Sequence, residues 1–181
     1  VEQSRIELDE AIDYKLTLVN NSNPVITDLV LLDILPYDSD MRNSSFAGDF
    51  TLETLTLEQT GEMGGNLRVY LSNDTGKRND TAKTVNTNAS DWVLLTGTTT
   101  GKKTTYTIPA NLRTAAAIMV LGDVDGMSRH VISIGMQTDG NNAGDLYVNN
   151  ATLSGVGIPD EVRAAPVNTF VVSRSVAGRV W

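Results

Sequence analysis

Cysteine is absent from the sequence and aromatic residues are scarce. Without cysteine there is no disulfide bond, no cysteine-ligated zinc ion and no cysteine nucleophile. Aromatic residues make up 6% of the 181 positions and hydrophobic residues 40%, so the core must consist mainly of Val, Leu and Ile. These residues pack well on pleated sheets. A chain of this length has room for one substantial core or two small ones.

The sequence also has few positively charged residues and no long apolar run. The formal net charge is -8 and the pI is near 4.5. Because an acidic surface repels phosphate backbones, we expect no nucleic-acid partner, whereas solubility and cation binding both suit this charge. No apolar run approaches the roughly 18 residues of a membrane helix, so we expect no membrane insertion of this segment. The chain opens in polar sequence without an initiator methionine or a signal peptide, and we interpret it as a piece of a longer protein.

The chain does contain many short apolar runs, separated by clusters of Asn, Thr, Gly and Asp. This pattern is typical of β-proteins with many turns, and we predict an all-β sandwich of about ten to twelve short strands. Residues 25–35 are more continuously apolar and predict a strand buried on both sides. One or two helical turns are expected, at residues 109–114 and 159–166, and a long surface loop at residues 73–91. No repeat or linker interrupts residues 1–172, which we interpret as one domain followed by a tail, residues 173–181.

Several short motifs resemble those of a known class of module. They are Tyr14-x-Leu16-x-Leu18-x-Asn20, then Asp33-x-Leu35-Pro36 after a turn, then Asp91-Trp92 behind a polar loop, and the late segment 144–151. Together they resemble the conserved-repeat modules of Gram-positive cell-wall-anchored surface proteins. Residues 176–181 look like the first strand of a collagen-adhesin B-type repeat.

The resemblance implies an immunoglobulin-like β-sandwich that serves as a non-catalytic stalk or adhesion module. It also implies an extracellular location, with attachment to the cell wall through another part of the full-length protein. The expected partners are neighbouring modules of the same chain and a host matrix protein or glycan.

Lys15 is the first candidate site residue. Modules resembling this one can carry a Lys–Asn isopeptide bond, with an acid beside it, and of the five lysines only Lys15 lies inside an apolar run. Asn168 at the start of the last apolar run is the candidate partner, and Asp33 or Glu53 the candidate acid. Burial would lower the pKa of the lysine and raise that of the acid, which the reaction needs. Lys15 is out of phase with its apolar neighbours, however, so a solvated strand lysine is the alternative.

A calcium site is the second candidate, because oxygen ligands are clustered on two turns. Asp123 and Asp125 lie on the first turn, and Asp139, Asn141 and Asp145 lie on the second. No glutamate closes either turn, so the spacing is not that of an EF-hand, and hydrogen-bonded turns explain these residues equally well.

The third candidate is a calcium-supported carbohydrate-binding module, the alternative function. Trp92, Tyr70, Tyr106 and Tyr147 could stack on sugar rings, although scattered aromatics in a sandwich are also core residues. Enzymatic motifs are missing. His130 is the sole histidine, and neither a nucleophile elbow nor a phosphate-binding loop is present, so we expect no enzyme and no cofactor other than possible calcium.

Overall fold

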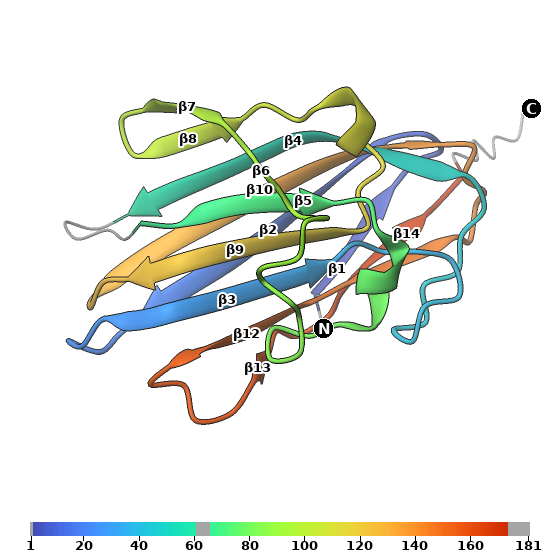
Figure 1. Ribbon diagram of the computed structural model, residues 1–181. Coiled ribbons are helices and arrows are strands. Elements are labelled where there is room, and N and C mark those ends of the chain that lie inside the picture. The colour runs from blue at the N-terminus through green and yellow to red at the C-terminus, as the bar shows by residue number, and fades with distance from the viewer. Residues whose placement is uncertain (1, 61–65, 174–181) are drawn as a thin grey trace, which may run out of the picture.

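The computed structural model describes residues 2–60 and 66–173. In this part of the chain the fold is an all-β sandwich with two short 3-10 helices, which confirms the predicted class. Figure 1 shows the two main sheets packed as layers. The predicted B-type strand at residues 176–181 lies outside the described residues.

The first layer is a five-stranded sheet in the order β2–β10–β4–β8–β7. Its long strands alternate inward and outward residues, as a sheet with one buried face requires. The strands are β2 (Ala11–Asn20), β10 (Ser128–Asp139), β4 (Asp49–Thr60), β8 (Lys103–Tyr106) and β7 (Gly97–Thr100). β2 forms one edge of this sheet.

The second layer is a six-stranded sheet in the order β13–β12–β3–β9–β5–β6. Its strands are β13 (Val162–Arg163), β12 (Ala151–Val156), β3 (Ile26–Ile34), β9 (Ala117–Val124), β5 (Arg68–Ser72) and β6 (Val93–Leu94). A small third sheet, in the order β1–β14–β11, joins β1 (Glu2–Ile6), β14 (Val167–Val171) and β11 (Leu146–Asn149). In it β1 pairs in parallel with β14, so the first and last described strands lie side by side.

The central strands follow the order of an immunoglobulin domain, but the outer ones do not. β3, β9 and β5 neighbour one another as strands B, E and D do, and β10 and β4 as strands F and C do. Beside β10, where the last strand of an immunoglobulin domain lies, this chain places its early strand β2. Beside β3, where the first strand lies, it places the late strand β12. The sandwich is therefore immunoglobulin-like with the two outer strands exchanged.

The main core fills the space between the two large sheets. Its fully buried side chains come from β3, β9 and β5 on one side and from β2, β4 and β10 on the other; they include Leu29, Val120, Leu71, Ile12, Leu55 and Ile134. The predicted alternation along β4 changes phase, because both Leu52 and Leu55 point inward. A β-bulge explains the change: Gly135 pairs with Thr54 and Met136 pairs with Leu52, which leaves Glu53 as the extra residue.

A second, smaller core lies on the outer face of the six-stranded sheet. Residues 73–92, which we call the covering segment, cross this face and contain the 3-10 helix η1 (Thr75–Asn79) (Figure 1). They bury Ala82, Val85 and Trp92 against Leu32, Ile34, Ala117 and Met119. The prediction that residues 25–35 are buried on both sides is confirmed for residues 29–35, because Leu29 and Leu31 face the main core while Leu32 and Ile34 face the second one. Val25, Thr27 and Asp28 are exposed.

Three local predictions need correction. The region 159–166 contains the short strand β13 and no helical turn, because it pairs with the edge of β12. The covering segment contains a helical turn where only a loop was expected. Within residues 2–60 and 66–173 the strands number fourteen, above the predicted range, because the Asn150 break divides residues 146–153 into β11 and β12 and because β6 and β13 are only two residues long. The helical turn expected at residues 109–114 is present as η2 (Ala110–Leu112).

Candidate functional site

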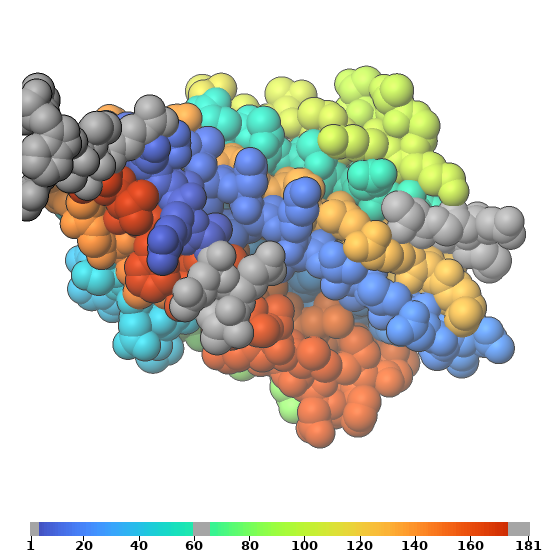
Figure 2. Space-filling view, turned by 180° about the vertical axis from the view of Figure 1, so that it is seen from behind, coloured from blue at the N-terminus to red at the C-terminus, as the bar shows by residue number. Residues whose placement is uncertain are grey.

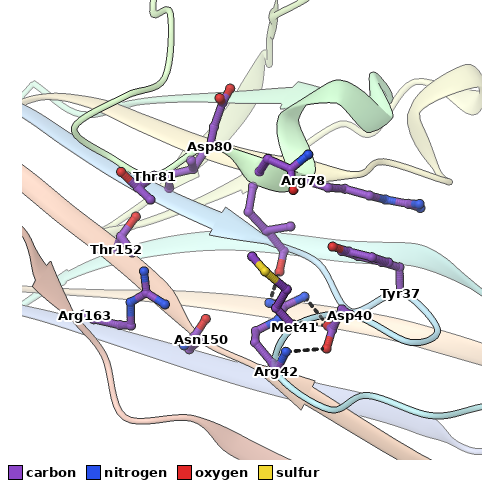
Figure 3. Close-up of a pocket in the computed structure, with 13 residues that line it drawn as sticks. Tyr37, Asp40, Met41, Arg42, Arg78, Asp80, Thr81, Asn150, Thr152 and Arg163 are labelled. Carbon is purple, nitrogen blue, oxygen red and sulfur yellow. Dashed lines mark hydrogen bonds and ion pairs between the residues drawn. The ribbon is translucent and has the colours of Figure 1, made fainter.

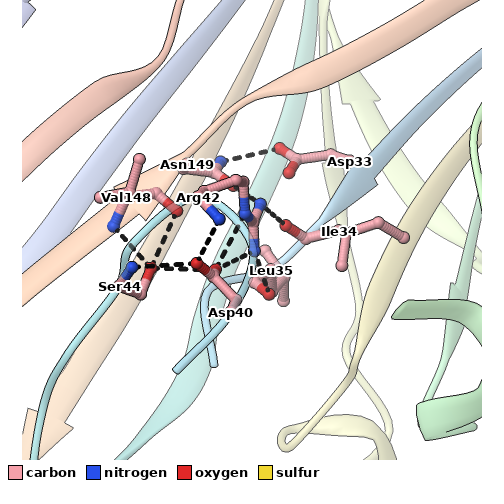
Figure 4. Close-up of polar contacts among 8 residues, drawn as sticks. All are labelled: Asp33, Ile34, Leu35, Asp40, Arg42, Ser44, Val148 and Asn149. Carbon is pink, nitrogen blue, oxygen red and sulfur yellow. Dashed lines mark hydrogen bonds and ion pairs between the residues drawn. The ribbon is translucent and has the colours of Figure 1, made fainter. Parts of the chain in front are cut away.

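A buried polar network lies where β3 ends and β11 meets the loop of residues 36–45 (Figure 4). Asp33 on β3 is fully buried, and its Oδ2 accepts a hydrogen bond of 3.0 Å from Asn149 Nδ2 on β11. The two residues are 116 positions apart in the sequence. The network therefore ties an early strand to a late one.

Arg42 is the centre of this network. Its guanidinium forms an ion pair of 2.6 Å with Asp40 and donates hydrogen bonds to the carbonyl oxygens of Ile34 and Leu35. Asp40 in turn accepts from the backbone and side chain of Ser44, at 2.9 Å each. Because Arg42 and Asp40 each have several partners, the network fixes the loop that follows the Asp-x-Leu-Pro motif.

Asp33 has an unusual protonation equilibrium. Burial raises the pKa of its carboxyl group to about 7, an effect that the Asn149 hydrogen bond and the Arg42 charge only partly oppose. Its Oδ1 has no hydrogen-bond partner among the described residues. The buried hydroxyl of Tyr14 lies nearby, and burial raises the pKa of that group as well. The carboxyl group of Asp33 therefore changes its protonation state near neutral pH.

A cavity of about 120 Å³ opens beside this network, between the covering segment and the outer face of the six-stranded sheet (Figure 3). Leu32 and Ile34 lie on the β3 side, and Arg42 and Asp40 lie at the edge shared with the network. Thr81, Thr152, Asn150 and Arg163 supply polar groups from the covering segment and from the β12–β13 edge. The cavity is small and is lined by both polar and apolar groups, and it is a place where a small ligand group could be held.

The structure does not turn the proposed isopeptide residues Lys15 and Asn168 toward the core. Lys15 is on the exposed face of the edge strand β2, at an apolar groove of about 310 Å³ between β2 and the β12–β13 edge. Figure 2 shows this face, with the N-terminal strands in blue beside C-terminal residues in red. The residues that point inward are the neighbours in sequence, Tyr14 on β2 and Thr169 on β14, and not Lys15 or Asn168. Adjacent residues of a strand point to opposite faces of the sheet. Lys15 and Asn168 are each one residue away from the inward-pointing position.

The two candidate acids also differ in position. Asp33 is in the core and accepts a hydrogen bond from Asn149, which belongs to the late motif of residues 144–151 and was not predicted as its partner. Glu53 is exposed at the β4 bulge, where it forms an ion pair of 2.8 Å with Arg113. We therefore find no lysine, asparagine and acid brought together within the described residues in the arrangement that the sequence suggested.

The residues proposed for calcium lie on turns at opposite ends of β10. Asp123 accepts from the backbone of Asp28, and the Asp125 carbonyl oxygen accepts from Asn20 and Ser128. On the other turn, the carboxylate of Asp145 accepts from the Asn142 and Ala47 amides, at 2.7 and 3.0 Å. Asn141 is buried and bridges Asp9 to Thr138, while Asp139 ends β10. Within residues 2–60 and 66–173, no three acidic or histidine side chains gather into a metal-binding group.

The proposed sugar-stacking aromatics are part of the two cores. Trp92 is 8% exposed and packs from the covering segment onto the outer face of the six-stranded sheet, and the ammonium group of Lys77 lies 6.0 Å from its ring. Tyr147 is fully buried and stacks on Phe46, while Tyr70 and Tyr106 are half-buried against the cores. Because Trp92 and Tyr147 have no exposed ring face, they are not available to a sugar in this conformation. His130 is buried as well, and burial lowers its pKa.

Comparisons with known proteins give similarities of shape only. No protein-family model matches the chain, and neither does any curated protein. Among solved structures, a family 123 glycoside hydrolase from Clostridium perfringens matches with a TM-score of 0.41 and 9% identity, over 95% of this chain and 23% of the hydrolase.

Two Gram-positive adhesin domains are also similar. The collagen-binding domain of a Staphylococcus aureus adhesin has a TM-score of 0.39 and 17% identity, over 91% of this chain and 89% of that domain. The C-terminal domain of an antigen I/II polypeptide from Streptococcus agalactiae has a TM-score of 0.37 and 12% identity, over 93% of this chain and 45% of that one. Identities and TM-scores this low do not transfer a function to this chain.

Within the described residues there is also no helix with the length and apolar character needed to cross a membrane.

Proposed function

We propose that this chain is a non-catalytic structural module of a bacterial cell-surface protein, which carries mechanical load and presents a binding region. The observation that supports the proposal is the parallel pairing of β1 with β14, in which Glu2 lies opposite Val167 and Ile6 opposite Val171. The chain therefore enters at one end of this pair and leaves at the other. A pull on the two ends acts along the strands in opposite directions.

This geometry resists force by shear. When two parallel strands are pulled from opposite ends, the hydrogen bonds between them lie across the direction of the force and must break together. β14 is also paired on its other side with β11, and the Val172 amide donates a 2.9 Å hydrogen bond to the carbonyl oxygen of Ile6. Ser4 and Thr169 add a side-chain hydrogen bond of 2.7 Å across the same pair. Load is thus distributed over one compact three-stranded sheet.

The polar residues of the motifs support a structural role. Asn20, which is buried, donates to three carbonyl oxygens and accepts from the amide and hydroxyl of Ser22, so it holds the β2–β3 turn. Asp33 is held by Asn149 in the interior. The resemblance of these motifs to those of cell-wall-anchored surface proteins supports an extracellular module, attached through another part of the full-length protein. Neighbouring modules and a host matrix protein or glycan are its proposed partners.

Single-molecule force measurements test the load-bearing role. The chain lacks cysteine, so one introduced cysteine defines a pulling point without ambiguity. We expect a higher unfolding force when the N-terminus is pulled against Val172→Cys, beyond the far end of β14, than against Ala165→Cys, just before its near end. Pulling between the N-terminus and residue 172 shears β1 from β14. Pulling between the N-terminus and residue 165 opens the same hydrogen bonds one at a time. Both positions are exposed, so the two variants are matched. Equal forces in the two directions, or a lower force in the shear direction, would overturn the proposal.

A further inference from the structure

Arg78 lies between two cavities and has no ion-pair partner among residues 2–60 and 66–173. It belongs to η1 in the covering segment, and its guanidinium carbon lies 4.2 Å from the centre of the Tyr37 ring. Its Nε is buried and has no hydrogen-bond partner among the described residues. Figure 3 shows the guanidinium lying against Tyr37. This half-buried arginine has no carboxylate beside it among the described residues, whereas Arg42 and Arg113 each have one.

The two cavities beside Arg78 differ in character. One is the 120 Å³ cavity described above, which Arg163 also lines, an arginine with no ion pair within residues 2–60 and 66–173. The other, of about 310 Å³, is lined on one side by the rings of Tyr37, Phe46 and Phe50 and includes Asp38 and Asp49. All three rings are half-buried, so part of each faces the cavity. Arg78 and Tyr37 line both cavities and form a ridge between them.

We propose that the Arg78–Tyr37 ridge binds a carboxylate-bearing sugar of the uronic acid class. The planar fork of Arg78 matches a carboxylate, and its stacking on Tyr37 already fixes its orientation. The rings of Tyr37, Phe46 and Phe50 offer apolar surface to the C–H face of a pyranose. The carboxylates of Asp38 and Asp49 can accept hydrogen bonds from sugar hydroxyl groups. This combination distinguishes the ridge from the buried Trp92, which the sequence had suggested.

The charges around the ridge limit the ligand further. Asp38 and Asp49 line the larger cavity, and Asp40 and Asp80 line the smaller one, so a polyanion would be repelled. Asp40 is neutralised by Arg42, and Asp38 accepts from Ser39 and from the Phe46 amide. A ligand with one negative charge and several hydroxyl groups fits these surroundings, whereas a phosphate or a nucleic-acid backbone does not. The site does not depend on the load-bearing role, and either proposal can fail without the other.

Titration of the labelled protein with three small probes tests the site. Glucuronate carries both the ring and the charge, glucose the ring alone, and acetate the charge alone. We expect glucuronate to shift the backbone amide signals of Tyr37, Phe46, Phe50 and Arg78 in a saturable way, with glucose and acetate binding at least about tenfold more weakly. Acetate binding as well as glucuronate would overturn the sugar assignment. No saturable shift with glucuronate would overturn the site.

Two matched variants locate the binding. Arg78→Lys keeps the charge but removes the fork, and we expect glucuronate binding to weaken by about tenfold. Arg113→Lys makes the same change at an exposed arginine paired with Glu53, and binding should be unchanged. Asp49→Asn provides a second variant in the cavity that leaves Arg78 in place, and we expect weaker binding with an unchanged melting temperature. Equal binding by wild type and Arg78→Lys, when both give the same spectrum without ligand, would overturn the proposal.

Discussion

The two faces of the six-stranded sheet are both buried, but in different ways. The inner face packs against a second sheet, and its contacts follow the regular alternation of strands. The outer face is covered by residues 73–92, which contain no strand and only one short helix. β3 contributes buried side chains to both faces, because Leu31 points to the main core and Leu32 points to the second core. A strand can thus be buried on both sides without a second sheet on each side.

The polar groups on the two faces differ as well. The inner side of β3 carries Asp33, a buried acid with a single hydrogen-bond donor for its carboxyl group. The covering segment instead uses peripheral contacts: Lys77 pairs with Asp91 at 2.7 Å, and the Ala82 amide donates to Thr152 on β12 at 2.8 Å. On the inner face, the buried carboxyl group of Asp33 makes the stability of the fold depend on pH. On the outer face, polar contacts attach an irregular segment to the sheet. The following predictions test this difference, from the largest expected effect to the smallest.

The largest effect should come from the pH dependence of Asp33. Its pKa is about 7 in the folded protein and 3.8 in the unfolded chain, so the folded state binds the proton more tightly. The stabilisation is complete below about pH 4 and is lost as the pH rises through about 7, with a total of roughly 4 kcal/mol. Urea unfolding between pH 4 and 8 measures it. Asp33→Asn should remove most of this slope, and a slope that survives in the variant would contradict the assignment.

A matched pair of valine truncations compares the two cores directly. Val120→Ala removes two methyl groups from the inner core, between two rigid sheets, and should cost about 2 kcal/mol. Val85→Ala makes the same change at the contact between the covering segment and the sheet. The covering segment can shift to fill the cavity that this leaves, so the change should cost about 1 kcal/mol. Urea unfolding midpoints at constant m-value measure both. If Val85→Ala proves as costly as Val120→Ala, the covering segment is as rigid as a sheet.

The sequence predicted the inner face better than the outer one for a physical reason. Alternating apolar residues such as Tyr14, Leu16 and Leu18 indicate that one face of the strand is buried. The continuous apolar run 25–35 indicated that both faces are buried. The cover was not predictable, because residues 73–92 are mostly polar and bury only a few small or scattered side chains such as Ala82 and Val85. An irregular segment has no periodic pattern of apolar residues, so the sequence does not indicate which of its side chains are buried.

The polar contacts of the site were predictable only one residue at a time. The sequence drew attention to Asp33 through the Asp-x-Leu-Pro motif, but its partner Asn149 lies 116 positions away and no local pattern connects them. Arg42 and Arg78 lie in polar segments and carried no signal of their own. The parallel β1–β14 pair is equally non-local, since its strands come from the two ends of the described chain. Such pairings are set by topology, which a single sequence does not contain.

The smallest effect should come from Lys15, which belongs to neither core. It lies on the exposed face of an edge strand, where a charged side chain discourages pairing with another chain. We expect Lys15→Ala to change the free energy of unfolding by less than about 0.5 kcal/mol. We also expect an intact mass without loss of ammonia, because Lys15 faces away from Asp33. Lys15→Val should leave stability similar but increase self-association, measured by light scattering, whereas Lys15→Glu should not. A mass lower by one ammonia, abolished in Lys15→Ala, would instead place this lysine in a covalent bond and reverse the assignment of its face.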